Sequence, residues 1–212
     1  MKGILFKPDM IKAIRDKRKT VTRRLAGLKE INECPDDWKL SGFNFGVVHF
    51  WNKNDVNMPA VRVKPREGGK YQVGETVYIK EAWAGAPWQD DLPPSEMSQE
   101  PGLLAYKACP EDINYCLAGK WRSPLFMPAW AARDFLKITD VRAERLQEIT
   151  SEDCIAEGIA KEYRHIFFEK TSRHLIDEYK ELWNSINKEH PWESNPWIFR
   201  YQFEEVTSEH KE

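Results

Sequence analysis

The sequence of 212 residues lacks any long apolar run. A hydrophobic stretch of about 18 residues or more is the usual sign of a membrane helix, and this chain has none. The apolar stretch near the N-terminus, Ile4–Phe6, is also too short for the hydrophobic region of a signal peptide. The sequence therefore predicts a soluble, cytoplasmic protein with no membrane partner.

Cysteine is scarce, and its spacing is uninformative. The four cysteines are Cys34, Cys109, Cys116 and Cys154. They form no C-x-x-C pair, and no histidine stands at the spacing of a zinc ligand. Disulfides belong to oxidising compartments, and the sequence carries no export signal. We therefore expect reduced, mostly buried thiols and no zinc site.

Signatures of phosphate binding and of metal-dependent catalysis are missing as well. The chain has no G-x-x-x-x-G-K-[ST], no G-x-G-x-x-G, no G-x-S-x-G and no H-E-x-x-H, and its five histidines are scattered. Nucleotide triphosphate hydrolysis, dinucleotide redox chemistry and zincin-type proteolysis thus have no sequence support. Any catalysis is expected to depend on Lys, Thr, Glu and Arg side chains, with no metal and no cofactor.

Charge is distributed unevenly, although the formal net charge is only −2. Residues 1–30 carry ten basic and three acidic side chains, whereas the rest of the chain carries 22 basic and 31 acidic ones. This contrast favours a local anionic partner near the N-terminal segment over a broad nucleic-acid surface. The alternative is a solvated helix face. Lys12 and Arg15 are expected to be solvated in either case.

Short segments of alternating polarity dominate the predicted secondary structure. The expected strands are Gly3–Phe6, Val47–Trp51, Ala60–Lys64, Thr76–Lys80, Leu103–Lys107, Phe135–Arg145 and Trp197–Phe203. The last strand gives the strongest signal, because aromatic residues occupy every second position. Residues 26–45 are expected to be irregular. Residues 84–102, which are rich in proline, are expected to form an inserted surface loop.

Helix signals are fewer. Pro8 suits the first turn of a helix that ends near Lys17. Thr150 and Asp153 have the spacing of a capping box, and the short helix that they open would be closed by Gly158. Thr171 or Ser172 caps a longer helix with an apolar stripe of Leu175, Tyr179, Leu182, Trp183 and Ile186. Short strands with few helices between them indicate an α+β fold, a small curled barrel with helices at its ends, in one domain of residues 1–212.

A cluster of polar side chains follows the first predicted helix. If residues 19–24 are extended, Thr20, Thr22 and Arg24 share one face of the strand. Lys19 lies at the bend and can turn to the same side. Together these side chains can bind a carbonyl group, a phosphate or a base edge. A basic turn that only faces solvent explains the same pattern.

Two glutamates are candidates to complete this cluster. Glu157 lies next to a predicted helix C-terminus, where the helix dipole disfavours an acid, and a local rule broken in this way points to function. The alternative for Glu157 is an exposed residue at a helix end. Glu81 ends a predicted strand and stands close to Trp83, whose ring is able to stack on a base.

These residues resemble a known family. Lys19-Thr20-Val21-Thr22-Arg23-Arg24 is similar to the K-T-x-T-x-R form of the ASCH domain signature, G-x-K-x-x-E-x-R, within the PUA-like superfamily. Lys17 stands where that signature has glycine. Further segments resemble phage- and prophage-encoded ASCH-type proteins: Gly74–Trp83, Lys120–Pro124, Met127–Arg133, Ile155–Ile159 and Asn195–Trp197.

The resemblance implies a PUA-like β-barrel with a cleft that accommodates RNA or a modified nucleoside. Small bacterial members of the family are metal-independent N4-acetylcytidine amidohydrolases that use a Lys, a Thr and a Glu. Carried onto this sequence, Lys19 is the general base and Thr22 attacks the amide carbonyl or orients a water to do so. Glu157 then donates a proton to the leaving amine. Arg24 matches the signature arginine, which orients the substrate or contacts phosphate.

Two other functions fit the same residues. In a non-catalytic RNA-binding module, or a ribonuclease, Lys19 and Arg24 contact phosphate while Trp83, Trp121 or Trp130 stacks on bases. A phage protein that binds a host protein through residues 84–125 is a third alternative, which only the proline-rich segment supports.

Overall fold

The computed structural model of the chain describes residues 1–44, 47–55, 60–63, 70–100, 102–108, 118–159 and 168–206. Within these ranges the helices are α1 (Pro8–Arg15), α2 (Lys29–Glu33), α3 (Ser151–Ala156) and α4 (Phe168–Ile186). The strands are β1 (Lys2–Leu5), β2 (Val21–Arg24), β3 (Trp38–Asn44), β4 (Val47–Asn52), β5 (Val61–Val63), β6 (Thr76–Lys80), β7 (Trp83–Ala84), β8 (Ala105–Tyr106), β9 (Phe135–Arg145) and β10 (Trp197–Val206). The α+β prediction is confirmed. Among the described helices, none combines the length and apolar character that crossing a bilayer requires.

The chain folds as two compact units that are interleaved along the sequence. Unit 1 consists of residues 1–17, 76–137 and 204–212, and unit 2 consists of residues 18–75 and 138–203. Strands β9 and β10 each begin in one unit and end in the other. The predicted domain of residues 1–212 is thus not divided into consecutive halves, and it stays a prediction.

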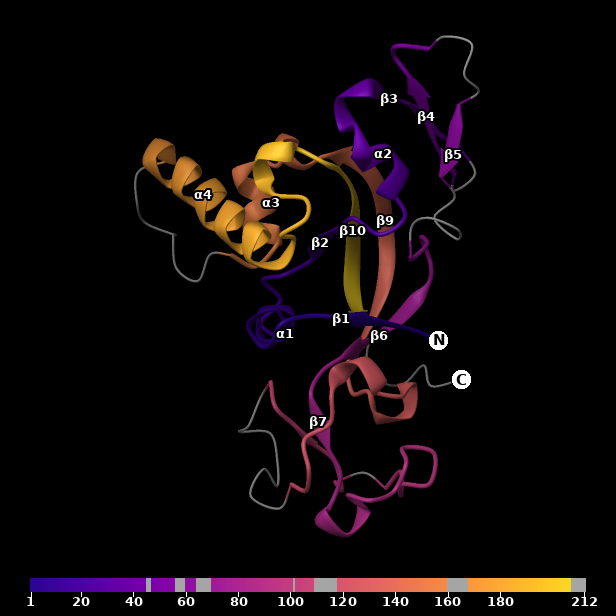
Figure 1. Cartoon of the computed structure of the whole chain (residues 1–212). Coiled ribbons are helices and arrows are strands. Elements are labelled where there is room, and N and C mark those ends of the chain that lie inside the picture. The colour runs from indigo at the N-terminus through magenta and orange to yellow at the C-terminus, as the bar shows by residue number, and fades with distance from the viewer. Residues whose placement is uncertain are drawn as a thin grey trace. The chain divides into compact units, whose positions relative to one another are not determined.

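The strands form open sheets. The largest sheet has the order β1-β6-β9-β10-β2, and the smaller ones have the orders β3-β4-β5 and β7-β8 (Figure 1). In unit 1, β1 pairs in parallel with β6, which pairs antiparallel with the start of β9. In unit 2, β10 pairs antiparallel with β2. No closed barrel is formed by the described strands, so the PUA-like barrel stays a prediction.

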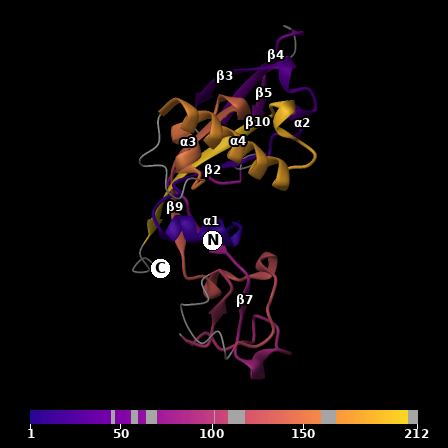
Figure 2. The same ribbon diagram turned by 90° about the vertical axis from the view of Figure 1, so that its left-hand side faces the viewer.

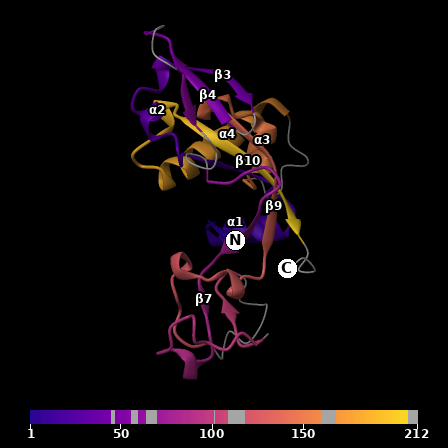
Figure 3. The same ribbon diagram turned by 90° about the vertical axis from the view of Figure 1, so that its right-hand side faces the viewer.

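Unit 2 has three layers, which the alternation of side chains along β10 explains. Ile198 packs with Leu175 and Trp183 of α4 on one face of the strand. The preceding residue, Trp197, points the other way, and its ring contacts Phe50 of β4 edge-to-face at 5.0 Å between centroids. Strands β2 and β10 are therefore covered by α3 and α4 on one face and by β3-β4-β5 on the other. Figure 2 views these layers from the helix side and Figure 3 from the opposite side.

The core of unit 1 lies around Trp83, whose side chain is fully buried among Tyr78, Met97 and Met127. Its neighbourhood corrects the expectation of a surface loop over residues 84–102. This segment begins in β7 and contains buried residues, among them Gln89 and Met97. Proline correctly indicated irregular backbone here, but irregular backbone does not require exposure.

The predicted bounds of the other strands and helices are confirmed in some cases and wrong in others. Strand β9 has the predicted bounds, while β5 and β8 are shorter than predicted. Residues 26–45 are not irregular throughout, because β3 pairs with β4, and a register shift between Leu40 and Gly42 interrupts the alternation that would have revealed it. Helix α4 begins at Phe168, before the predicted caps Thr171 and Ser172. Its stripe is buried at Leu175, Tyr179 and Trp183, but Ile186 is exposed.

The end of α1 brings one confirmation and one correction. Lys12 is exposed, as expected. Arg15 is not a solvated residue: its guanidinium donates to Asp134 at 2.6 and 3.1 Å. Lys17, which follows the C-cap Asp16, has a φ of 56° in the left-handed region. That conformation closes many helices and is usually taken by glycine, the residue that the ASCH signature has at this position.

The strained backbone at Lys17 predicts that glycine is favoured there over alanine. A left-handed conformation costs a residue with a Cβ atom about 1–2 kcal/mol, part of which the flexibility of unfolded glycine offsets. We expect Lys17→Gly to be more stable than Lys17→Ala by about 1 kcal/mol in urea unfolding. At Lys12, inside α1, the order should reverse, because glycine is about 1 kcal/mol worse than alanine in a helix. The same order at both positions would contradict the prediction.

Candidate functional site

Glu157 is placed by the two ends of the short helix α3. Thr150 and Asp153 form the predicted capping box, in which each side chain accepts a hydrogen bond from the backbone of the other. At the other end Gly158, with a φ of 85°, donates to the carbonyl of Ile155, and Ile159 donates to that of Cys154. This is a Schellman closure, so the prediction that Gly158 ends the helix is confirmed. Glu157 is the C-cap residue and is buried, not exposed.

Lys19 contacts Glu157 through both its backbone and its side chain. The two residues form an isolated antiparallel bridge, and the Thr20 amide donates to the carbonyl of Ala156 at 2.8 Å. The Lys19 Nζ donates to Glu157 Oε2 at 2.5 Å, to the Glu157 carbonyl at 3.0 Å and to the Val21 carbonyl at 2.8 Å. Lys19 is 2% exposed and Glu157 5% exposed, so this amine and carboxylate meet almost without water.

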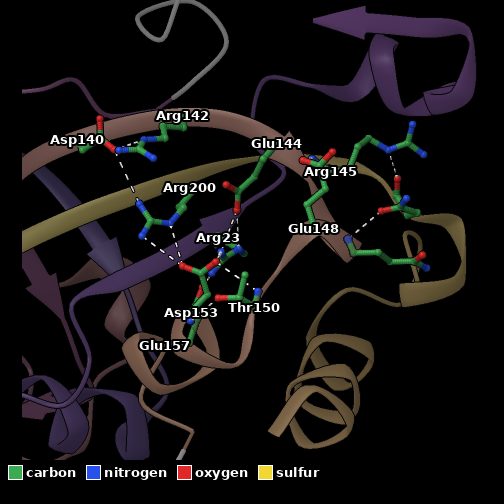
Figure 4. A network of polar contacts seen from close by, with 12 residues as sticks. Arg23, Asp140, Arg142, Glu144, Arg145, Glu148, Thr150, Asp153, Glu157 and Arg200 are labelled. Atoms are coloured by element: carbon green, nitrogen blue, oxygen red, sulfur yellow. Dashed lines mark hydrogen bonds and ion pairs between the residues drawn. The ribbon is translucent and has the colours of Figure 1, made fainter. Parts of the chain in front are cut away.

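Arg23 binds the other oxygen of the same carboxylate. Its Nη1 donates to Glu157 Oε1 at 3.3 Å, and its Nε donates to Glu144 Oε1 at 2.9 Å (Figure 4). Its Nη2 lies 2.9 Å from Asp153 Oδ2, and Asp153 also binds Arg200. We call the set of these charged side chains the Lys19–Glu157 cluster; it comprises Lys19, Arg23, Glu144, Asp153, Glu157 and Arg200.

Burial and charge act in opposite directions on the two cations that hold Glu157. Burial lowers the pKa of Lys19, and the nearby charges of Arg24 and Arg23 lower it further, while the Glu157 carboxylate opposes this shift. Burial also acts to lower the pKa of Arg23, but Glu157, Glu144 and Asp153 outweigh it and raise that pKa. Lys19 is therefore the cation of this pair that can lose a proton.

Thr22 and Arg24 occupy the face of β2 opposite to Arg23. Successive strand residues alternate in direction, and the pairing agrees: Arg23 lies opposite Arg200, with which it shares Asp153, and Thr22 lies opposite Tyr201. Thr22 is buried, and within the described part of the chain no hydrogen bond joins it to Lys19 or Glu157. Arg24 is half-buried, and burial lowers its pKa. Thr20 is exposed.

The remaining predicted site residues belong to unit 1. Glu81 is buried and accepts two hydrogen bonds from Arg133, at 2.9 and 3.1 Å. Trp83 is fully buried and contacts the half-buried Trp130 edge-to-face at 5.7 Å between centroids, and Trp121 is half-buried. The contacts described above for Glu81 and Trp83 are with other residues of unit 1. An apolar cavity of about 250 Å³ in unit 1, bordered by Ala86, Trp88, Leu103 and Leu104, is lined by no predicted site residue.

Within the ranges that the structure describes, no three His, Cys, Asp or Glu side chains are placed to hold a metal ion. Cys34 and Cys154 are free thiols, and burial raises the pKa of Cys154 to about 12. Cys109 and Cys116 lie outside the described residues.

Arg23, Glu144, Asp153 and Arg200 are the members of the Lys19–Glu157 cluster that sequence reasoning missed. The parity of an extended chain places Lys19 and Arg23 on one face, separate from Thr22 and Arg24. This alternation can be read from the sequence, and it groups Lys19 with Arg23, the two cations that both contact Glu157 in the structure. Nothing in the sequence singles out Glu144, because its contact depends on the register of β9.

No protein-family model matches the chain, and neither a curated protein nor a solved structure matches it. The resemblance to the ASCH family thus stays a prediction that its motifs carry.

The buried Lys19 amine predicts how stability depends on pH. In the unfolded chain the pKa of lysine is about 10.4, whereas burial lowers it in the folded protein. Between these two values the unfolded chain binds more protons, so the free energy of unfolding rises with pH, by at most about 1.4 kcal/mol per pH unit. We expect the unfolding free energy of the wild type, relative to Lys19→Met, to increase with pH in the alkaline range below about pH 10.4.

Urea unfolding followed by tryptophan fluorescence measures this difference. Other lysines and tyrosines titrate in both proteins and cancel when the two curves are subtracted. A difference that stays constant across this range would mean that Lys19 ionises in the folded protein as it does in water.

Proposed function

We propose that the buried pair of Lys19 and Glu157 is the acid–base centre of a hydrolase that removes the acyl group from N4-acylated cytidine, either as the free nucleoside or within RNA. The observation that carries the proposal is the contact between the buried Lys19 amine and Glu157 Oε2. The ASCH-like motif supplies the substrate class, and the contact supplies a pair able to exchange a proton.

The pair holds one proton that either residue can carry. With the proton on Lys19 it is an ion pair; with the proton on Glu157 it is a neutral amine beside a carboxylic acid. Burial lowers the pKa of the Lys19 amine, because it removes the hydration that stabilises the ammonium, and so acts toward the neutral amine. The neutral form contains both groups that amide hydrolysis needs, a base and an acid.

The reaction balances within this pair. The neutral Lys19 amine takes a proton from water, and the resulting hydroxide attacks the amide carbonyl. The bond between the carbonyl carbon and N4 breaks as the Glu157 acid donates its proton to N4, which gives a carboxylic acid and cytidine. Lys19 is then an ammonium and Glu157 a carboxylate, and proton transfer between them restores the starting pair.

A water nucleophile agrees better with the geometry than direct attack by Thr22. Among the hydrogen bonds that the structure describes for Lys19, none is with the Thr22 hydroxyl, and the register of β2 places Thr22 on the face opposite to Arg23. Thr22 and Arg24 lie on the opposite face of β2 from the cations that hold Glu157, so this step assigns no role to them.

The non-catalytic alternative depends on stacking of bases, and the full burial of Trp83 removes one of its three stacking residues. Trp121 and Trp130 are half-buried and stay candidates for this role.

Release of cytidine from N4-acetylcytidine tests the proposal. We expect purified wild type to catalyse it. Lys19→Arg should lower turnover by about 10²–10⁴-fold, because a guanidinium does not act as a base. Glu157→Gln keeps the shape of the acid but lacks the proton to donate, and it should lower turnover by about 10²-fold or more. Lys53→Arg is the matched control: Lys53 donates to the carbonyl of Asp36 in the same unit, and turnover should not change.

Circular dichroism of all four proteins separates lost activity from lost folding. Absence of turnover in a folded wild type would overturn the amidase proposal for this substrate. Binding of the nucleoside or of RNA without turnover would then favour the non-catalytic alternative.

A further inference from the structure

Arg23 is the side chain that joins the parts of the site. We propose that Arg23 is its positioning residue: it holds one oxygen of Glu157 so that the other faces Lys19, and its charge keeps Lys19 able to act as a base. This inference rests on the proposed function. The Arg23 side chain contacts Glu157, Glu144 and Asp153, so it acts on the reaction through Glu157 and Lys19.

The contacts of Arg23 span α3 and reach the largest sheet. Asp153 lies in the first turn of α3 and Glu157 is its C-cap, so one guanidinium holds both ends of the helix. A third contact, to Glu144, fixes the same group to β9. Rotation or sliding of α3 along β2 would break at least two of these contacts, and α3 is therefore held in one register against Lys19.

The two oxygens of Glu157 are divided between the two cations. Oε1 accepts from Arg23 at 3.3 Å and Oε2 accepts from Lys19 at 2.5 Å. Without Arg23 the whole carboxylate would be available to Lys19 and would hold its proton more firmly. The positive charge of Arg23 also opposes a second positive charge nearby, which lowers the pKa of Lys19.

Other ionisable groups near Lys19 also bear on how strongly Arg23 lowers its pKa. Arg24, on β2, also lowers the pKa of Lys19. Tyr179 of α4 is buried near Glu157 and Arg23, and burial raises its pKa well above the usual value, so it stays neutral. Asp153 and Glu144 face Arg23. Glu157 is the largest charge acting on Lys19, and Arg24 and Arg23 oppose it. Removal of Arg23 leaves Arg24 to oppose Glu157, so the titration of Lys19 should move to higher pH.

Three variants separate the charge of Arg23 from its geometry. Arg23→Gln removes the charge, and Arg23→Lys keeps the charge but lacks the planar fork of donors with which the guanidinium reaches its three carboxylates. Arg200→Gln is the matched control, because Arg200 shares Asp153 with Arg23 but has no contact with Glu157. Thermal unfolding of each variant shows that it is folded.

The pH dependence of kcat/KM for N4-acetylcytidine is the first measurement. In Arg23→Gln, the limb of the pH profile that reports deprotonation of Lys19 should move upward by half a pH unit or more. The variant should also lower kcat about tenfold at pH 7, while KM stays within about threefold of the wild-type value. Arg23→Lys should lower kcat with that limb in place. Arg200→Gln should leave both unchanged. Equal limbs in Arg23→Gln and Arg200→Gln, or wild-type kcat in Arg23→Lys, would overturn the proposal.

A second measurement does not depend on turnover. The Lys19 Nζ is titrated by NMR in protein with ¹⁵N-labelled lysine, and Lys19→Met assigns its signal. The midpoint should rise in Arg23→Gln and stay in place in Arg200→Gln. An unchanged midpoint in Arg23→Gln would overturn the role of Arg23. If the wild type lacks turnover while the midpoint shifts, the proposed function fails and the electrostatic role of Arg23 stands.

Discussion

A buried ion pair between Lys19 and Glu157 is the constraint on which unit 2 depends. Removing two charges from water costs several kcal/mol for each ion, and the attraction between them offsets this only when the remaining hydrogen-bonding positions are also filled. Here they are filled by the Val21 carbonyl, the Glu157 carbonyl and Arg23. The wider cluster alternates three cations with three carboxylates, so no charge in it lacks an opposite neighbour.

Two secondary-structure elements have one end at this pair, and two strands contribute to the wider cluster. Strand β2 begins just after Lys19, α3 ends at Glu157, and β9 and β10 contribute Glu144 and Arg200. The apolar layer around Tyr179 and Trp183 covers the same face and keeps water away. Packing and electrostatics therefore support each other, because the dry environment that makes the charges costly also makes their mutual attraction strong.

Local signals in the sequence predicted local structure well. The alternation in β10, the capping box at Thr150 and the closure at Gly158 all depend on neighbouring residues, and all three are confirmed. Prediction failed where distant residues decide. Strand β3 was missed because its bulge disrupts the alternation, and Arg15 was expected in solvent because its partner, Asp134, is 119 residues away. At the site, Lys19 and Glu157 were predicted, whereas Arg23 was missed. Its role depends on contacts with three carboxylates that lie more than 100 residues away in the sequence.

The interleaving of the two units has a consequence for dissecting the protein. The backbone passes between the units at residues 17–18, 75–76, 137–138 and 203–204. A single protease cut at any one of these points leaves the units covalently joined, and no continuous fragment contains one unit complete and alone. Separating them requires a redesigned chain order, in which residues 18–75 are linked directly to residues 138–203. Truncation from either terminus removes part of unit 1 first.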